Sequence, residues 1–488
     1  MADDLHPDSD QNPALRRAAL IAGPLLGLAL MALPAPGALD LAAWRLAGLI
    51  AWMVTWWIGQ AVPLAATALL PVPLMPALGI APVAQVTQSY ADPIIFLFLG
   101  GFMIAAAMQR HALHRRIALA IVAAMGAAPA RITLGFMLAT AFLSMWISNT
   151  ASTVMMFAVA LPVIGFVGEN SPDDARSRRF GVALMLAIAY SASIGGVATL
   201  IGTPPNALLA SVLATSHGIE IGFGRWMLLG LPLSALMLLA CFLLLTRVLY
   251  PLSNLMPDGA DTVIAHERAA LGPMHKGETR VAIVFALAAA GWMSRGALDL
   301  PLSDAGIAIA AAIALFVLPA GGGTGAGAGR LLDWRDTAAL PWGILILLGG
   351  GLALATGFER TGLAEWIGGG FAFLDEWPLW LLVMAVAGLT LMITEVSSNT
   401  AVTATFLPIL GAVAIGMGLP VEWLMVPAAM AASMAFMMPV ATPPNAIVFG
   451  YEGMRMADMV RAGIWLNILG VGLITLAMWL VAAPVLGL

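Results

Sequence analysis

Apolar runs of about 20 residues recur along almost the whole chain, and each is long enough to cross a lipid bilayer as a helix. Only 10% of the 488 residues are charged, against about 25% in soluble proteins. The alternating short strands of a transmembrane β-barrel do not occur in the sequence. These features predict an all-α polytopic membrane protein.

Basic residues indicate which loops face the cytoplasm, because short loops rich in Lys and Arg favour that side. One threading, with the N-terminus inside and the C-terminus outside, predicts about eleven transmembrane helices plus two re-entrant hairpins. It places inside Arg16 and Arg17, Arg110 to Arg116, Arg131, Arg176 to Arg179, the basic residues of Pro251 to Arg280, Arg330 and Arg335, and Arg455 and Arg461, and it leaves Arg45, Arg225 and Arg295 outside.

The same threading gives the expected organisation of the chain. Residues 1–17 form a retained cytosolic tail, because they lack the basic start and cleavage site of a signal peptide. Cys241 is the single cysteine, which excludes an intrachain disulfide and a thiolate metal cluster. The expected parts are a first half at 18–250 with a hairpin at 131–166 and a broken helix at 180–215, a cytoplasmic loop at 251–280, and a second half at 281–488 with a hairpin at 379–418 and a broken helix at 423–450.

Three short motifs occur twice in the same order. Ser-Asn-Thr appears in "MWISNTAST" and "EVSSNTAVT", a Gly-Gly pair in "FLGG" and "LLGG", and Pro-Pro-Asn in "GTPPN" and "ATPPN". Nearly constant offsets between such copies indicate an internal repeat. The offsets are 250 residues from Asn149 to Asn399, 249 from Gly100 to Gly349, and 239 from Asn206 to Asn445.

Flanking charges predict that the two Ser-Asn-Thr segments enter the membrane from opposite faces. Arg131 and Arg176 to Arg179 flank the first segment, whereas Asp375, Glu376 and Glu422 flank the second. Each segment then begins and ends on one side, as re-entrant hairpins of an inverted repeat do. The alternative is a pair of ordinary spans joined by a polar turn. That turn lacks the Gly, Pro or charge that an aqueous turn usually includes.

Helix ends inside the membrane are the predicted chemistry of both motifs. The Thr-Pro-Pro-Asn segments predict breaks in two helices, with Thr as the N-cap and Pro in the first turn. Such breaks are tolerated in the hydrocarbon core only around a buried cavity. Helix N-termini attract anions, and unpaired carbonyls at helix C-termini suit a small cation such as Na⁺. Four such ends are expected to hold one anion together with cations.

Two further features carry weaker expectations. Glu395 precedes the second tip, and a carboxylate inside a membrane is a functional candidate. Its counterpart in the first copy is Met145, which favours a structural or tuning role over a proton relay. The glycines of the Gly-Gly pairs are expected at close helix contacts or kinks rather than at a ligand.

The segment "ASMAFMMPVATPPNAIVFG" (Ala432 to Gly450), together with the two Ser-Asn-Thr tips, resembles the divalent-anion/sodium symporter family. Members of that family are carriers of dicarboxylates, citrate or sulfate. By motif the resemblance extends from about Asp92 to Arg461 and covers nearly the whole chain. It implies a homodimer, each protomer having a scaffold domain and a transport domain that moves as an elevator.

The resemblance also implies site residues at the matching motif positions. The first sodium site is expected at Ser144, Ser148, Asn149 and Gly202, and the second at Thr394, Ser397, Asn399 and Ala441. The anion is expected to contact Asn149, Thr150, Ser398, Asn399 and Thr400, with Thr203, Pro204, Thr442 and Pro443 at the border of its pocket.

The implied function is sodium-coupled symport of a divalent anion, most simply a C4-dicarboxylate such as succinate. No Lys, Arg or His replaces a cation ligand, which favours sodium coupling over exchange. A sodium-independent exchanger or a proton-coupled carrier on the same fold is the alternative, and a channel is a further transport reading. An intramembrane enzyme is disfavoured, because neither a His-Glu-x-x-His nor a Gly-x-Ser-x-Gly motif occurs.

The expected partners are Na⁺, a small anion, the bilayer and a second copy of the chain, with no nucleic acid. The composition is rich in Ala and Arg and includes a single Lys. This composition is typical of a bacterium with GC-rich DNA, so the expected location is the bacterial cytoplasmic (inner) membrane.

Overall fold

The computed structural model describes every residue except 1–12, 38, 127, 171–173, 253–259, 297, 299–300, 322–328, 372–373 and 375. Most of the expected cytosolic tail, residues 253–259 near the start of the loop 251–280 and the acidic residue Asp375 therefore lie outside the described residues. The described part of the chain is helical and contains no strand. An isolated antiparallel bridge joins Pro319 to Arg330.

The chain divides into two compact units, each assembled from separate stretches of sequence. The first unit comprises Met1–Ile95, Ala207–Glu220 and Trp342–Ala432, and the second comprises Phe96–Asn206, Ile221–Pro341 and Ser433–Leu488. Both units draw on both predicted halves. The two Ser-Asn-Thr tips fall in different units, the first tip in the second unit and the second tip in the first unit.

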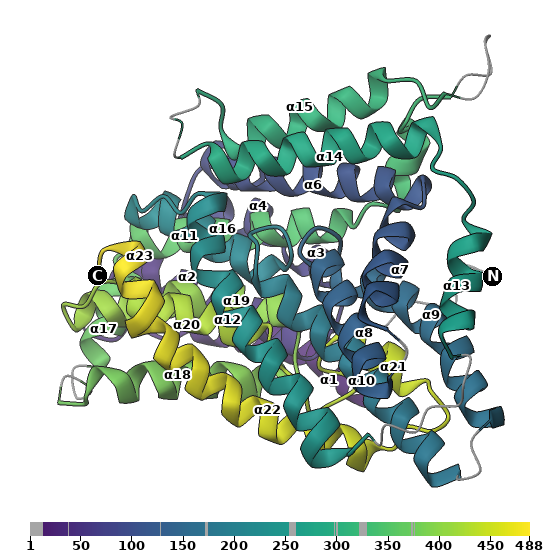
Figure 1. Ribbon diagram of the computed structural model, residues 1–488. Helices are drawn as coiled ribbons and strands as arrows, with labels where there is room; N and C mark the ends of the chain where they lie inside the picture. The colour runs from purple at the N-terminus through teal and green to yellow at the C-terminus, as the bar shows by residue number, and fades with distance from the viewer. Residues whose placement is uncertain are drawn as a thin grey trace. The chain divides into compact units, whose positions relative to one another are not determined.

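Unit one draws its helices from three separate stretches of the chain, and most of these helices are labelled in Figure 1. Its elements are α1 (Pro13–Ala32), α2 (Leu41–Ile58), α3 (Leu64–Thr67), α4 (Pro71–Ala77), α5 (Val83–Gln88), η2 (Ser89–Ala91), most of α11 (Pro204–His217), α16 (Trp342–Thr361), α17 (Leu363–Gly370), α18 (Leu379–Thr394), α19 (Asn399–Gly416) and α20 (Glu422–Ala432). In this unit α1 packs against α2, and α20 packs against both α18 and α19.

Unit two holds the middle of the chain and its C-terminal end. Its elements are most of α6 (Pro93–Arg110), α7 (Leu113–Met125), α8 (Pro129–Ser144), α9 (Asn149–Asn170), α10 (Asp174–Val197), α12 (Phe223–Leu243), η3 (Leu244–Leu249), α13 (Ala260–Ala270), α14 (Lys276–Ser294), α15 (Asp304–Val317), η4 (Trp334–Ala339), α21 (Pro443–Phe449), α22 (Met456–Ala477), η6 (Met478–Ala482) and α23 (Ala483–Leu486). The helix α10 packs against α8, α9, α12 and α21, and α14 runs beside α15 (Figure 1).

Nine helices in the described residues are long and apolar enough to cross a membrane, by length and composition. Two of them, α9 and α19, are the second arms of the predicted hairpins. The first arms, α8 and α18, have 16 residues each and belong to a group of shorter apolar helices. At 1.5 Å per residue such an arm rises about 24 Å, less than the roughly 30 Å of the hydrocarbon core.

The paired glycines lie at close helix contacts. A side chain at Gly100 would meet the backbone of Ala308 at 2.6 Å, and one at Gly350 would meet the carbonyl oxygen of Ala68 at 2.4 Å. Backbones approach this closely only where a residue has no Cβ. The two pairs therefore serve helix packing within their own units.

Candidate functional site

The first Ser-Asn-Thr tip is a short turn between two helix ends. The helix α8 ends at Ser144 and α9 begins at Asn149. The Ser148 hydroxyl accepts a hydrogen bond from the backbone N–H of Ala151 (3.3 Å), which satisfies one free donor of the first turn of α9. The tip therefore brings a helix C-terminus and a helix N-terminus together with neutral side chains only.

The second tip repeats this local structure. The helix α18 ends at Thr394 and α19 begins at Asn399, each 250 residues after its counterpart. The Ser398 hydroxyl accepts from the N–H of Ala401 (3.5 Å) as the cap of α19. The same turn chemistry thus shapes both tips.

Four oxygen-bearing groups of the first half meet at Asn149. The end of its carboxamide lies 2.5 Å from the Ser144 hydroxyl and 3.2 Å from the carbonyl oxygens of both Gly202 and Ala192. The Ser144 hydroxyl donates to the Ala192 carbonyl (2.6 Å). With its nitrogen toward this cluster, the Asn149 amide lies within hydrogen-bond distance of all three oxygens. With its oxygen toward the cluster, four oxygens surround one point and suit a small cation.

Two glycines allow the broken-helix loop to approach the first tip. A side chain at Gly196 would lie 2.6 Å from the Asn149 side-chain oxygen, and one at Gly202 would lie 2.4 Å from the carbonyl oxygen of Gly196. Neither position has room for a methyl group. The loop and the tip are therefore in direct contact, and Ser144, Asn149 and Gly202 of the predicted first sodium site lie together.

Hydroxyl and amide oxygens also gather at the second tip. The Thr394 hydroxyl donates to the Leu391 carbonyl (2.8 Å). The buried Ser397 hydroxyl and the buried side-chain oxygen of Asn399 have no hydrogen-bond partner among the described residues. Two buried neutral oxygens without donors fit a hard cation, which takes oxygen ligands. These three residues belong to the first unit, and Ala441 belongs to the second.

The Pro-Pro-Asn asparagines tie each interrupted helix across its break. The Asn206 amide donates to the carbonyls of Gly196 (3.2 Å), Val197 (3.2 Å) and Thr199 (2.7 Å). The Asn445 amide donates to the carbonyls of Ala435 (3.3 Å) and Met438 (3.0 Å), which lie ten and seven residues before it, as Gly196 and Thr199 lie before Asn206. These bonds occupy the Gly196 and Val197 carbonyls at the end of α10, the Thr199 carbonyl after it, and the Ala435 and Met438 carbonyls in the stretch between α20 and α21. Both asparagines are fully buried.

The residues expected around the anion differ in exposure. The side chain of Thr150 is exposed, and those of Asn149, Ser398, Asn399 and Thr400 are half-buried. The loop hydroxyls of Thr203 and Thr442 are buried, Pro204 is half-buried and Pro443 is exposed. Thr203 lies 3.2 Å from the hydroxyl of Ser433, and Thr442 caps α21 by accepting from the N–H of Asn445 (3.4 Å).

An aromatic cluster anchors the first tip. The ring of Trp146 stacks on Phe223 and Trp292, with ring centres 6.0 and 6.3 Å apart, and meets Phe285 edge-on at 5.0 Å. Aromatic pairs at this spacing add to the stability from burial alone. The sequence motif ends in polar residues and gave no indication of this anchor, because the partners come from distant helices.

The sequence also did not predict a role for Thr199, Gly196 or Ala192. The Thr199 hydroxyl donates to the carbonyl of Met145 (2.5 Å) and accepts from the N–H of Gly202 (3.1 Å). The available signal was the Gly-Gly pair at 195–196 and a hydroxyl residue three positions before Gly202. Both lie in an apolar run in which small residues are common.

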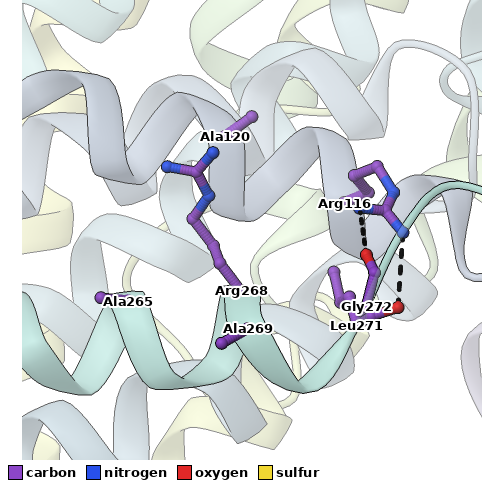
Figure 2. Close-up of a pocket in the computed structure, with 7 residues that line it drawn as sticks. All are labelled: Arg116, Ala120, Ala265, Arg268, Ala269, Leu271 and Gly272. Carbon is purple, nitrogen blue, oxygen red and sulfur yellow. Dashed lines mark hydrogen bonds between the residues drawn. The ribbon is translucent and has the colours of Figure 1, made fainter.

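A surface cavity of about 530 Å³ lies between α7 and α13, and it contains none of the predicted site residues. Figure 2 shows its lining, in which Arg116 donates to the carbonyl oxygens of Gly272 (3.1 Å) and Leu271 (3.5 Å). Arg116 is also paired with the buried carboxylate of Glu278. The remaining lining is mostly alanine, so the cavity lacks the neutral oxygen cluster seen at Asn149.

Comparison with known proteins identifies relatives over the full length of the chain. The profile of a family described as "sodium:sulfate symporter transmembrane region" matches residues 15–487. The sodium-dependent dicarboxylate transporters SdcS of Staphylococcus saprophyticus and Staphylococcus aureus are 38% and 40% identical to this chain, respectively. Each alignment covers 96% of this chain and 92% of the relative. The crystal structure of the Alcanivorax borkumensis YdaH transporter shares its fold, with a TM-score of 0.57 at 14% identity, over 88% of this chain and 97% of that one.

Proposed function

We propose that this chain, which belongs to the sodium:sulfate symporter family, is a secondary transporter that moves a dicarboxylate together with sodium ions. The observation that carries the proposal is the oxygen cluster at Asn149, which is neutral, buried in part and built from helix ends. Two of the relatives are named as sodium-dependent dicarboxylate transporters, which supports the same substrate class here. No feature of the cluster offers a nucleophile with a base, so transport is preferred to catalysis.

The first sodium ion is proposed to bind Ser144, Ser148, Asn149 and Gly202. In this proposal the Asn149 amide presents its oxygen to the cluster, so that the Ser144 hydroxyl and the Gly202 carbonyl share the ion with it. Neutral oxygens at helix C-terminal ends are the ligands that membrane transporters use for Na⁺. The cluster has the required donor type without a carboxylate, which fits an ion that must also be released.

The second sodium ion is proposed to bind Thr394, Ser397, Asn399 and Ala441. The support is the repeated tip and the two buried oxygens of Ser397 and Asn399 that have no partner among the described residues. A bound cation would satisfy both. Thr394, Asn399 and Ala441 stand at the repeat positions of Ser144, Asn149 and Gly202, whereas Ser397 stands one residue before the counterpart of Ser148.

The anion is proposed to contact Asn149, Thr150, Ser398, Asn399 and Thr400, with the loop residues Thr203, Pro204, Thr442 and Pro443 beside it. None of these side chains is charged, so the two negative charges of a dicarboxylate need bound sodium and helix N-termini for balance. Sodium binding first would order the tips and create the anion site. The affinities of sodium and anion are then linked, which couples their fluxes.

An elevator movement of a homodimer in the bacterial inner membrane completes the proposal, with succinate as the substrate. Ser144 donates a hydrogen bond to the Ala192 carbonyl and Thr199 donates one to the Met145 carbonyl, so the first hairpin is joined at its tip to α10 and to the loop that follows it. Elements joined in this way move as one body. This favours an elevator movement, in which the binding site crosses the membrane with its elements, over a channel.

Radiolabelled succinate uptake into proteoliposomes tests the proposal, measured with and without an inward sodium gradient. Unlabelled citrate, sulfate and α-ketoglutarate serve as competitors that rank the substrates. Accumulation driven by sodium is the expected result. Uptake that requires only internal dicarboxylate would show an exchanger, and uptake that follows a pH gradient would show proton coupling. If sulfate is the only competitor that reduces uptake, sulfate replaces the dicarboxylate as the proposed substrate.

A further inference from the structure

The Thr199 hydroxyl joins the two segments that form the first sodium site. It donates its single proton to the carbonyl of Met145 at 2.5 Å and accepts from the backbone N–H of Gly202 at 3.1 Å. A threonine hydroxyl has one donor and two acceptor positions, so the bond to Met145 uses its only proton. Thr199 is fully buried, and both of its partners are backbone groups.

Both partners lie next to proposed ion ligands. Met145 follows Ser144 at the end of α8, and the Gly202 carbonyl is one of the oxygens around Asn149. The hydroxyl therefore fixes how far the tip stands from the broken-helix loop. Since a Cβ at Gly196 or Gly202 would clash, the spacing held in this way is close to the smallest possible.

No threonine stands at the corresponding position of the second half. The positions that correspond to Gly196, Thr199 and Gly202 by the repeat of the Pro-Pro-Asn motif are Ala435, Met438 and Ala441. Methionine has no hydroxyl to donate, and each alanine adds the Cβ that the first loop excludes. The two loops are thus alike in their asparagine bonds and different at the three positions that set the spacing.

We propose that Thr199 is a positioning residue of the first sodium site, which holds the tip and the broken-helix loop at the separation that the ion requires before the ion arrives. This inference rests on the proposed function, because it assumes that sodium binds at Asn149. It makes the first site a prebuilt one. Ion binding there does not have to offset the cost of ordering the loop, so the first site is filled at a lower sodium concentration than it would be without the Thr199 bonds.

Replacing Thr199 by valine removes the hydroxyl at nearly constant volume. The expected result is a rise of about tenfold in the sodium concentration that half-saturates stabilisation, which corresponds to the loss of a net hydrogen bond of ordinary strength. At saturating sodium the melting temperature and the maximal uptake rate should approach those of the unchanged protein. Thr199→Ser keeps the hydroxyl and should restore the normal sodium dependence.

Thr140→Val is the matched control. Thr140 is also fully buried on α8, but its hydroxyl bonds only the Phe136 carbonyl of its own helix (2.7 Å). The variants are purified in detergent, and their Tm is recorded without substrate while sodium replaces choline at constant ionic strength. Succinate uptake against sodium concentration is then measured in proteoliposomes. Should Thr199→Val fail to fold, Thr199→Ala is titrated in its place.

The outcomes separate this inference from the proposed function. A raised half-saturating sodium concentration in Thr199→Val, with normal values in Thr199→Ser and Thr140→Val, supports the inference. Sodium titrations of Thr199→Val that match the unchanged protein overturn it, and so does an equal shift in Thr140→Val. If sodium does not stabilise the unchanged protein at all, the proposed function itself fails.

Discussion

Met145 and Glu395 end the first arms of the two hairpins in the same backbone conformation, with φ of −64° and ψ of −26° at both residues. Each follows a helix of 16 residues and precedes a tip of the same hydrogen-bonding pattern. The repeat seen in the sequence is therefore a repeat of local structure. At this position the two copies share a backbone conformation and differ in side chain, since an apolar Met stands where the second copy has a buried Glu.

Glu395→Met should keep sodium-driven uptake, because Met145 occupies the same conformation without a carboxylate. The expected change is a reduction of at most a few fold in the maximal rate. Uptake measured between pH 5.5 and 8 should show the same pH dependence in the variant and in the unchanged protein. Loss of sodium-driven uptake in Glu395→Met, together with a lost response to a pH gradient, would show that Glu395 carries protons.

Asn149→Ala should reduce succinate uptake by at least about a hundredfold, because the amide is proposed to contact both the ion and the anion. Asn399→Ala should do the same through the second tip. Both variants should elute as the unchanged protein does in size-exclusion chromatography, since the hydroxyls of Ser148 and Ser398 still cap α9 and α19. Normal uptake by either variant would remove that tip from the transport site.

The hairpin tips and broken helices were within reach of sequence reasoning because their polar residues stand out in apolar runs. The bonds of Asn206 and Asn445 to nearby backbone follow from the need to satisfy carbonyls inside a membrane. Helix ends at Ser144, Asn149 and Thr394 follow from the capping chemistry of Ser, Thr and Asn. Local rules decide these features, so a single sequence suffices.

Contacts between segments distant in the chain were beyond that reasoning. Trp146 meets rings from α12 and α14, and Thr199 bonds Met145 across 54 residues. Tryptophan and threonine are common in membrane helices for other reasons, so neither residue type marks a contact by itself. The division into two interleaved units has the same origin, because it depends on which helices pack together.

Asn206→Ala should lower the thermal stability more than Asn445→Ala. Asn206 bonds three backbone carbonyls, one of them at 2.7 Å, whereas Asn445 bonds two, at 3.0 and 3.3 Å. The Val197 carbonyl keeps the ring N–H of Trp226 as a donor, so each variant deprives two carbonyls of the Asn donor, at about 1 kcal/mol or more each, and the shorter bond to Thr199 makes the loss of Asn206 the larger. Saturating sodium should restore neither variant, because both losses are structural. Melting curves in potassium and in sodium check this, and a full rescue of Asn206→Ala by sodium would contradict it.

Acidification should destabilise the protein through His114, which lies on α7 outside the candidate spans. Burial lowers the pKa of His114 below its usual 6.5, and the charge of Arg115 adds to this, against a backbone bond to Met108. A lowered pKa means that the unfolded chain takes up the proton first as pH falls. The stabilising contribution is therefore complete above about pH 6.5 and is lost below it. His114→Gln should reduce the change in Tm between pH 7 and pH 5. An unchanged dependence of Tm on pH would show that another group causes the loss of stability.

Gly202→Ala should weaken sodium binding at the first site, whereas Ala441→Gly should leave the second site close to normal. The added Cβ at Gly202 would stand 2.4 Å from the Gly196 carbonyl oxygen, so Gly202 must move away from Gly196 and its own carbonyl shifts relative to Asn149. Because Ala441 already carries a Cβ, its removal relieves no clash and changes only the freedom of the loop. Sodium titration of Tm should show at least a tenfold higher half-saturating concentration for Gly202→Ala and about twofold or less for Ala441→Gly. Equal shifts in the two variants would mean that the loops are equivalent, and the close approach at Gly202 would then have no part in binding the ion.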